Sequence, residues 1–300
     1  MLNFTAHPMN IPNLVFLNSA RPYIDNTRIR DWGGYVGMAI LGYLQGMETA
    51  PQTLPWYFDF AIYLASVALY LSFSFSVNNC FDYKGDRLGA KRSLNPIASG
   101  RISAGGGILF SCLLASLGLS LTWLHFGVAS FATYAAMLIL SASYSAPPLR
   151  LKSMPILDVA SHGLFFGSLI VLFGVTVTGG FNTFTLPLLL SVYNISLIIE
   201  LRNQIDDIRE DTATGIETTA VCIGLSRANI LFYGLLAIHM AMLTYIVSLL
   251  GNATLTWLAV LFFVGMGVYF YQRPNRDRFL LLVERVTPLV YILFIIRLLL

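Results

Sequence analysis

Apolar residues fall in long unbroken blocks that are apolar on every side, so block length says more than periodicity. A helix crosses the hydrocarbon core of a bilayer with about 20 residues, and about 17 suffice. We expect nine transmembrane helices, at about 33–47, 56–77, 105–124, 128–145, 156–178, 184–201, 230–250, 255–271, and from after Arg285 to the C-terminus. The pattern predicts an all-α integral membrane bundle that forms a single domain over residues 1–300.

The segments between the apolar blocks contain clear helix breakers. Pro147-Pro148 is expected to end the fourth span, and Gly179-Gly180 to turn the chain after the fifth. Residues 1–30 read as an N-terminal cytoplasmic or interfacial segment without a cleavable signal peptide. Within it, Ile11 to Leu17 could form a short interfacial helix, bounded at its end by a turn at Ala20-Arg21-Pro22.

Composition and charge support a multi-pass membrane protein. The chain is 56% hydrophobic and only 11% charged, against about a quarter charged in soluble domains. With nine spans, 17 of the 18 Lys and Arg residues fall in the N-terminal segment and the loops after even-numbered spans, and only Arg297 lies opposite. Because basic residues concentrate on the cytoplasmic side, we expect a cytoplasmic N-terminus and a C-terminus across the membrane.

The remaining composition excludes several function classes. The net charge of +3 follows from membrane topology and gives no indication of nucleic-acid binding. The three cysteines and four histidines are scattered, without the spacing of a disulfide framework or a zinc site. Nothing in the chain indicates an obligate protein partner.

Two acidic motifs share one unusual spacing. Each reads N-x-x-x-D-x-x-x-D, and each follows an even-numbered span, so both lie on the expected cytoplasmic face. Four residues of α-helix turn through roughly 400°, so residues at this spacing share one face if the helix continues. The motif residues are Asn78, Asp82 and Asp86 in the first copy, and Asn203, Asp207 and Asp211 in the second.

Carboxylates crowded in this way repel one another unless cations join them. Hard divalent ions such as Mg²⁺ take oxygen ligands and share phosphate oxygens, so two facing motifs would hold a diphosphate. Arg150, Lys152 and Arg202 lie tight against span ends and are candidate diphosphate contacts. Solvated loop carboxylates are the alternative, which the repeat of the same spacing on one membrane face makes less favourable.

The apolar spans below such a site suggest a ligand with a charged head and a long apolar tail, such as a polyprenyl diphosphate. Ionisation at its allylic carbon would need metal ions and cationic side chains at the leaving group. The allylic cation could rest against aromatic faces, for which the candidates are Tyr134, Tyr144, Phe165, Phe166, Phe173 and Tyr193.

Several segments resemble the UbiA superfamily of intramembrane prenyltransferases over most of the chain. Besides the two acidic motifs, they are 95–103, 144–152 and 214–224. The resemblance implies nine helices around a central cavity with a cytoplasm-facing polar cap, Mg²⁺ dependence, and prenyl transfer within the membrane. It assigns the six motif residues to the metal and diphosphate site, and Lys152 to the diphosphate. At Asn95, where many members have Arg, the chain departs from the family, and Arg92 could substitute.

The acceptor is not specified by the sequence. A quinone precursor, a glycerol-phosphate ether or a similar lipophilic or aromatic compound would suit the family. Asp158 and His162 lie four residues apart in the fifth span and could pair to orient or deprotonate an acceptor, or simply form an internal hydrogen bond. The alternatives are a terpene cyclase of the same superfamily and a transporter or binder of a phosphorylated lipid.

Overall fold

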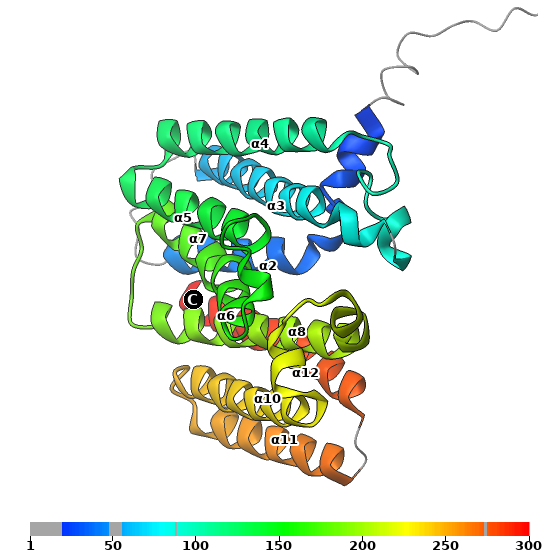
Figure 1. Cartoon of the computed structure of the whole chain (residues 1–300). Coiled ribbons are helices and arrows are strands. Elements are labelled where there is room, and N and C mark those ends of the chain that lie inside the picture. Colours follow the sequence, from blue (N-terminus) through cyan, green and yellow to red (C-terminus); the bar gives the residue numbers. More distant parts are fainter. Residues whose placement is uncertain (1–19, 48–55, 88, 273–274, 300) are drawn as a thin grey trace, which may run out of the picture.

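The computed structural model describes residues 20–47, 56–87, 89–272 and 275–299. All regular structure in these ranges is helical, as predicted, and Figure 1 shows the long helices stacked from α4 to α11. Eight helical segments are long and apolar enough to cross a membrane. They are α3 (Trp56–Asp86), α4 (Ala104–His125), α5 (Val128–Ser145), Leu157–Thr178, α8 (Thr185–Thr214), α10 (Leu225–Ser248), α11 (Ala253–Gln272) and α12 (Arg276–Leu299, of which Arg276–Ile296 is the candidate span).

The remaining elements are shorter. Helix α2 (Gly33–Met47) has 15 residues, and the fifth predicted span divides into α6 (Leu157–Gly163), the π-helical turn η4 (Leu164–Ser168) and α7 (Leu169–Thr178). Short helical turns near the mouth of the bundle are η1 (Ile29–Asp31), η2 (Ala90–Ser93), η3 (Leu151–Ser153) and α9 (Thr219–Ile223).

Two boundaries near the ends of the described chain differ from the sequence-based expectation. Helix α12 begins at Arg276 instead of after Arg285, because charged residues at the end of a span extend a helix beyond the hydrocarbon without breaking it. Residues 20–26 form a helix instead of a turn, since Pro22 lies in the first turn, where its missing N–H is not needed. The expected interfacial helix at Ile11 to Leu17 lies outside the described residues.

Both acidic motifs are helical throughout, so residues four positions apart do share one face of their helix. Helix α3 continues past the predicted end of its span to Asp86, and α8 continues to Thr214. The C-terminal ends of both helices lie at the same end of the bundle, on the right in Figure 1. The two motifs, far apart in sequence, are therefore brought to one end of the molecule.

The interior consists mainly of two apolar clusters. One is built chiefly from α2, α3, α5, η4 and α7, and it is rich in aromatic side chains such as Tyr63, Tyr70 and Phe173. The other joins α8 to α10, α11 and α12. The elements that line the candidate site, α3 and α5 on one side and α8 on the other, contribute to different clusters, which both include residues of α2 and α7. The site therefore lies where the two clusters meet.

Candidate active site

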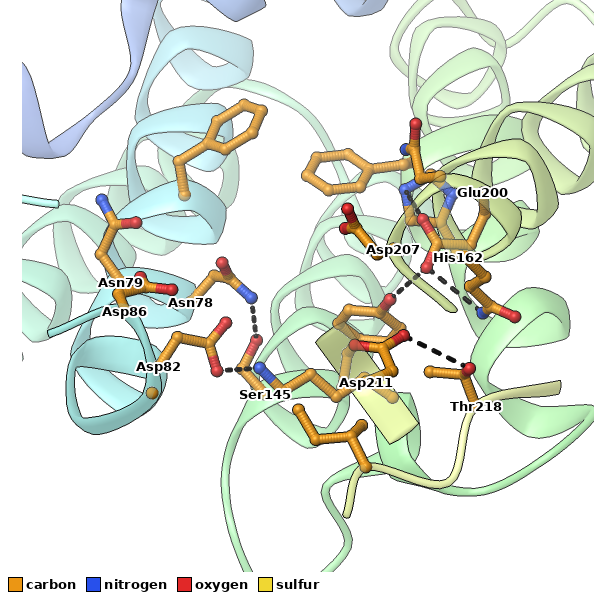
Figure 2. Close-up of a pocket in the computed structure, with 18 of the residues that line it drawn as sticks. Asn78, Asn79, Asp82, Asp86, Ser145, His162, Glu200, Asp207, Asp211 and Thr218 are labelled. Atoms are coloured by element: carbon orange, nitrogen blue, oxygen red, sulfur yellow. Dashed lines mark hydrogen bonds and ion pairs between the residues drawn. The ribbon is translucent and has the colours of Figure 1, made fainter. Parts of the chain in front are cut away.

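A cavity of about 650 Å³ opens between the ends of α3 and α8. Figure 2 shows Asp82 and Asp86 on α3 facing Asp207 and Asp211 across this space. The lining includes the six motif residues Asn78, Asp82, Asp86, Asn203, Asp207 and Asp211. The structure thus brings both motifs to one cavity, as predicted from their shared spacing and their place on one membrane face.

On the α3 side, each motif residue has a fixed neighbour. Asn78 donates from Nδ2 to Ser145 Oγ at 3.2 Å. Asp82 forms an ion pair with Lys152, and the Arg150 guanidinium lies 3.8 Å from the same carboxylate oxygen. These contacts join α3 to the chain that follows α5, where Pro147-Pro148 ends the helix as predicted.

Lys152 is buried beside a carboxylate that must later face an anionic substrate. Burial lowers the pKa of its ammonium group from the ordinary value of 10.5, and the Asp82 charge opposes that change. Arg150 enters the next turn with φ 42°, in the left-handed region, and its Nε is buried without a hydrogen bond. Two cationic side chains therefore lie at the mouth of the cavity beside Asp82.

Asn95 occupies the position where many members of the UbiA superfamily, which the sequence resembles, have Arg. It donates to Asp86 Oδ2 at 2.8 Å and to the Asn79 backbone carbonyl at 3.0 Å. Its own Oδ1 accepts from the backbone N–H of Ile97 at 2.9 Å. Asn95 thus orients the last carboxylate of the first motif without adding charge.

Arg92 does not replace the missing arginine. It lies exposed in η2 and is not part of the cavity lining, unlike Arg150, Lys152 and Arg202. The expectation that Arg92 contacts the substrate is therefore not supported. The loop that follows α3 directs the Asn95 side chain, and not that of Arg92, toward Asp86.

On the α8 side, the structure separates two adjacent aspartates. Asp206 is bonded to Arg276 at the start of α12, and to Arg202 at 3.4 Å. Asp211 accepts a hydrogen bond from Thr218 Oγ1 at 3.4 Å. Asp206, Asp207 and Asp211 all line the cavity, but Asp206 is engaged by two arginines. The assignment of Asp207 and Asp211 to the second motif stays a prediction.

Deeper in the cavity lies a carboxylate, Glu200, that belongs to neither sequence motif. Glu200 Oε1 accepts from Tyr144 Oη at 2.7 Å, and Glu200 Oε2 lies 3.5 Å from His162 Nε2. His162 Nδ1 is 3.1 Å from Ser196 Oγ. Glu200 precedes Asp207 by seven residues on α8, which is two helical turns. That spacing places both on one face, and it was the signal available in the sequence.

Aromatic rings form much of the inner wall. Of the six candidates, Tyr144, Phe165 and Phe166 line the cavity. Tyr134 and Phe173 instead lie fully buried in the cluster of α3, α5 and α7, and Tyr193 lies against Gly163, outside the lining. The sequence did not single out Tyr35 and Phe75, which also line the cavity, with Tyr35 stacked on Phe166 at 4.5 Å.

Asp158 has a structural role instead of facing an acceptor with His162. Its carboxylate accepts from the backbone N–H of Thr219 at 2.6 Å, from the Thr219 hydroxyl, and from Gln204 Nε2 at 2.9 Å. The residue is fully buried. It joins α6 to α9 and α8, while His162 is directed to Glu200 instead.

The donor set fits Mg²⁺ held jointly with a diphosphate. Among the described residues, no three His, Cys, Asp or Glu side chains form a complete metal cluster of their own. The lining instead offers carboxylate and amide oxygens from two opposed helices. Mg²⁺ is commonly bound through one or two carboxylates together with water and substrate phosphates, and the separated motifs match that mode.

Solved structures share this arrangement of helices over most of the chain. A UbiA homologue from Archaeoglobus fulgidus, solved with DMAPP and Mg²⁺, superposes with a TM-score of 0.71 at 21% identity, covering 92% of this chain and 97% of that one. A structure of digeranylgeranylglyceryl phosphate synthase gives 0.72 at 18% identity, covering 93% and 98%. At these identities the likeness establishes the fold.

The chain belongs to the UbiA prenyltransferase family, whose model matches residues 38–279. It is similar to a lycopene elongase/hydratase of Halobacterium salinarum, 31% identical over 210 residues that make up 67% of this chain and 71% of that protein. A probable homogentisate phytyltransferase 2 of Oryza sativa is 26% identical over 62% of this chain and 51% of its own length. The resemblance inferred from the motifs is thus confirmed, and the chain is a membrane-embedded prenyltransferase.

Proposed function

We propose that the protein transfers a polyprenyl group from an isoprenyl diphosphate to a lipophilic or aromatic acceptor within the membrane, in a Mg²⁺-dependent reaction. The observation that carries this proposal is the meeting of the two N-x-x-x-D-x-x-x-D motifs in one cavity, with Lys152 and Arg150 at its rim. The family relationship and the Mg²⁺ and DMAPP bound to the Archaeoglobus homologue support it.

The metal site is proposed to comprise the six motif residues, with Asp82, Asp86, Asp207 and Asp211 as its carboxylates. Bound Mg²⁺ offsets the negative charge that develops on a leaving diphosphate. Lys152 and Arg150 lie at Asp82 and so are placed to donate to diphosphate oxygens bound there. Arg202, on the opposite wall, is proposed as a further contact.

The inner wall then holds the prenyl chain. Tyr144, Phe165 and Phe166 present ring faces and edges below the motifs, where an allylic cation would form. Ring faces attract cations, and an apolar wall excludes water that would otherwise capture the cation. Charge stabilisation is therefore divided between the polar mouth and the aromatic interior.

The proposed topology has nine spans, in which α2 is the first along the chain and is added to the eight candidate spans. Its 15 residues are short for an independent span, but Gly42 and Gly46 in its C-terminal half pack closely against α7. Counting α2 keeps the basic segments together, so the N-terminus and the cavity mouth are assigned to the cytoplasmic side as a polar cap, and the C-terminus to the other.

The test is to replace one carboxylate of each motif. Purified Asp82→Ala and Asp207→Ala variants, assayed by mass spectrometry with geranyl diphosphate and either lycopene or homogentisate, should lose at least about 100-fold in turnover. Asp59→Ala is the matched control, because Asp59 lies exposed in the first turn of the same helix α3. Full activity in both motif variants with Mg²⁺ chelated would falsify the proposal.

A further inference from the structure

Among the described residues, Glu200 is the only acidic residue of the cavity lining that lies outside the two motif segments, 78–86 and 203–211. Its side chain is 13% exposed and is held from two sides by Tyr144 and His162. Gln204 Nε2 approaches the same Oε1 atom at 3.5 Å. A carboxylate with this support has one orientation and keeps acceptor lone pairs available to the cavity.

The position of Glu200 on α8 separates it from the carboxylates of the second motif. Seven residues of α-helix span about 10 Å, so Glu200 lies that much deeper along α8 than Asp207. Figure 2 shows Glu200 and His162 grouped together beyond Asp207. At this depth its neighbours in the lining are the rings of Phe165 and Phe166, which pack around His162 at centroid distances of 5.6 and 5.1 Å. A group here faces the prenyl chain and the acceptor instead of the diphosphate.

Each Lys or Arg of the described lining is paired with a carboxylate other than Glu200. Lys152 and Arg150 lie at Asp82, and Arg202 lies at Asp206. The fourth cation, Arg28, pairs with Asp31 at 2.8 Å and stacks on Phe75 at 5.0 Å. An acceptor carrying a carboxylate or phosphate would meet Glu200 without a free cation to offset the repulsion. The inner cavity therefore suits an uncharged acceptor.

We propose that Glu200 is the catalytic base that receives the proton lost by a neutral, unsaturated acceptor, such as a polyene, when its carbon is prenylated. This rests on the proposed prenyl transfer. The donor C–O bond breaks with its electron pair leaving on the diphosphate, and the π electrons of the acceptor form the new C–C bond. The resulting cation loses a proton from the adjacent carbon to a Glu200 oxygen, and the C–H electrons form a double bond. The proton leaves to water when the products depart.

Tyr144 and His162 act as positioning residues for this base. The Tyr144 hydroxyl fixes Oε1, and the imidazole, held by Ser196 through Nδ1, lies at Oε2. Tyr144 lies on α5 and His162 on α6, so two elements other than α8 hold the carboxylate. Removing one contact should slow proton removal more than donor binding.

The experiment compares wild type with Glu200→Gln, using dimethylallyl diphosphate as donor and lycopene as the neutral acceptor. Single-turnover release of diphosphate and product masses are followed together. We expect Glu200→Gln to release diphosphate within about threefold of the wild-type rate. The alkene product should fall about 100-fold, within the 10²–10⁴ range of general-base catalysis, or be replaced by a product heavier by one water. Glu217→Gln, an exposed loop carboxylate outside the lining, is the control.

The outcomes separate this inference from the proposed function. If Glu200→Gln forms as much alkene product as the wild type, Glu200 is not the base. An equal fall in diphosphate release and in alkene product also overturns this role, because it would indicate a role in donor binding or folding. Tyr144→Phe with an increased water-captured fraction and unchanged KM for the donor supports it. Wild-type turnover of homogentisate but not of lycopene overturns the neutral acceptor. Failure of wild type with every acceptor contradicts the proposed function itself.

Discussion

Lys152 and Asp82 show how single residues prepare the mouth of the cavity. The buried ammonium is stabilised by a carboxylate that is also expected to bind metal, so the two charges neutralise each other before substrate arrives. A lone buried charge would be costly, whereas a paired one is retained. A metal-bridged diphosphate at Asp82 then brings new oxygens within reach of Lys152.

We predict that Lys152→Met lowers kcat/KM for the diphosphate donor by about 10–100-fold, since a hydrogen bond to a charged group contributes about 1.5–3 kcal/mol. Steady-state kinetics with varied donor measures the loss. Lys84→Met is the control, because Lys84 is exposed on the same end of α3 and lies outside the lining. Equal loss in both variants would point to a general effect of surface charge.

Asp158 is a carboxylate that the sequence suggested could activate an acceptor, but its hydrogen bonds instead connect α6 to α8 and α9. Its carboxylate accepts four hydrogen bonds, the fourth from its neighbour Val159 N at 2.7 Å. We predict that Asp158→Asn destabilises the fold by about 2 kcal/mol, because an amide turns one acceptor oxygen into a donor that faces other donors. Thermal unfolding in detergent measures it, with Asp59→Asn as the control. An unchanged unfolding temperature would show that the network is dispensable.

At the scale of elements, the site depends on how closely helices approach. A Cβ atom at Gly42 of α2 would lie 2.2 Å from the Val171 carbonyl oxygen of α7, and one at Gly174 would lie 2.4 Å from the Tyr43 amide nitrogen. Small residues allow such backbone contact between membrane helices. The short α2 is thereby held against the helix that continues from η4, whose phenylalanines form the inner wall.

Gly42→Ala is therefore predicted to destabilise the protein by about 1–3 kcal/mol, the usual cost of overpacking. Gly37→Ala in the same helix meets no atom within 4 Å and should be neutral or slightly stabilising, because alanine favours helix by up to about 1 kcal/mol. The difference between the two unfolding temperatures is the measurement. Equal values would mean that α2 and α7 are not in backbone contact.

At the scale of the whole molecule, the cavity lies where the two apolar clusters meet and opens at one end. The carboxyl ends of α3 and α8 meet there, together with η3 and α9, which carry Lys152 and the partner of Asp158. Short loops at the opposite end return the chain. This asymmetry matches the distribution of Lys and Arg, and it determines from which side a soluble diphosphate would enter.

The orientation can be tested with cysteines in a Cys112→Ser background. Cys222 in α9 is exposed near the mouth, and Asn252→Cys would lie in the turn between α10 and α11 at the other end. In right-side-out vesicles, we predict that a membrane-impermeant maleimide labels Asn252→Cys but labels Cys222 only after permeabilisation. The reverse pattern would place the mouth outside the cytoplasm.

Local information in the sequence was sufficient for the helical class, for most span positions and for the two matched motifs. The length of an apolar run and the four-residue spacing of Asn78, Asp82 and Asp86 are properties of one segment, which bilayer thickness and helix geometry convert directly into structure. The family resemblance rests on the same kind of local segment. It covered the motif residues and Lys152, but it misplaced Arg92 and did not include Glu200, Tyr35 or Phe75, which also line the cavity.

Tertiary structure decided which side chains meet across segments. Glu200 and His162 pair from different helices, Asp158 bonds to Thr219 instead of His162, and Asn95 but not Arg92 reaches Asp86. Such contacts depend on the rotation and separation of packed helices. Membrane helices are apolar on every side, so their sequence leaves that rotation open until close packing, as at Gly42 and Val171, sets it.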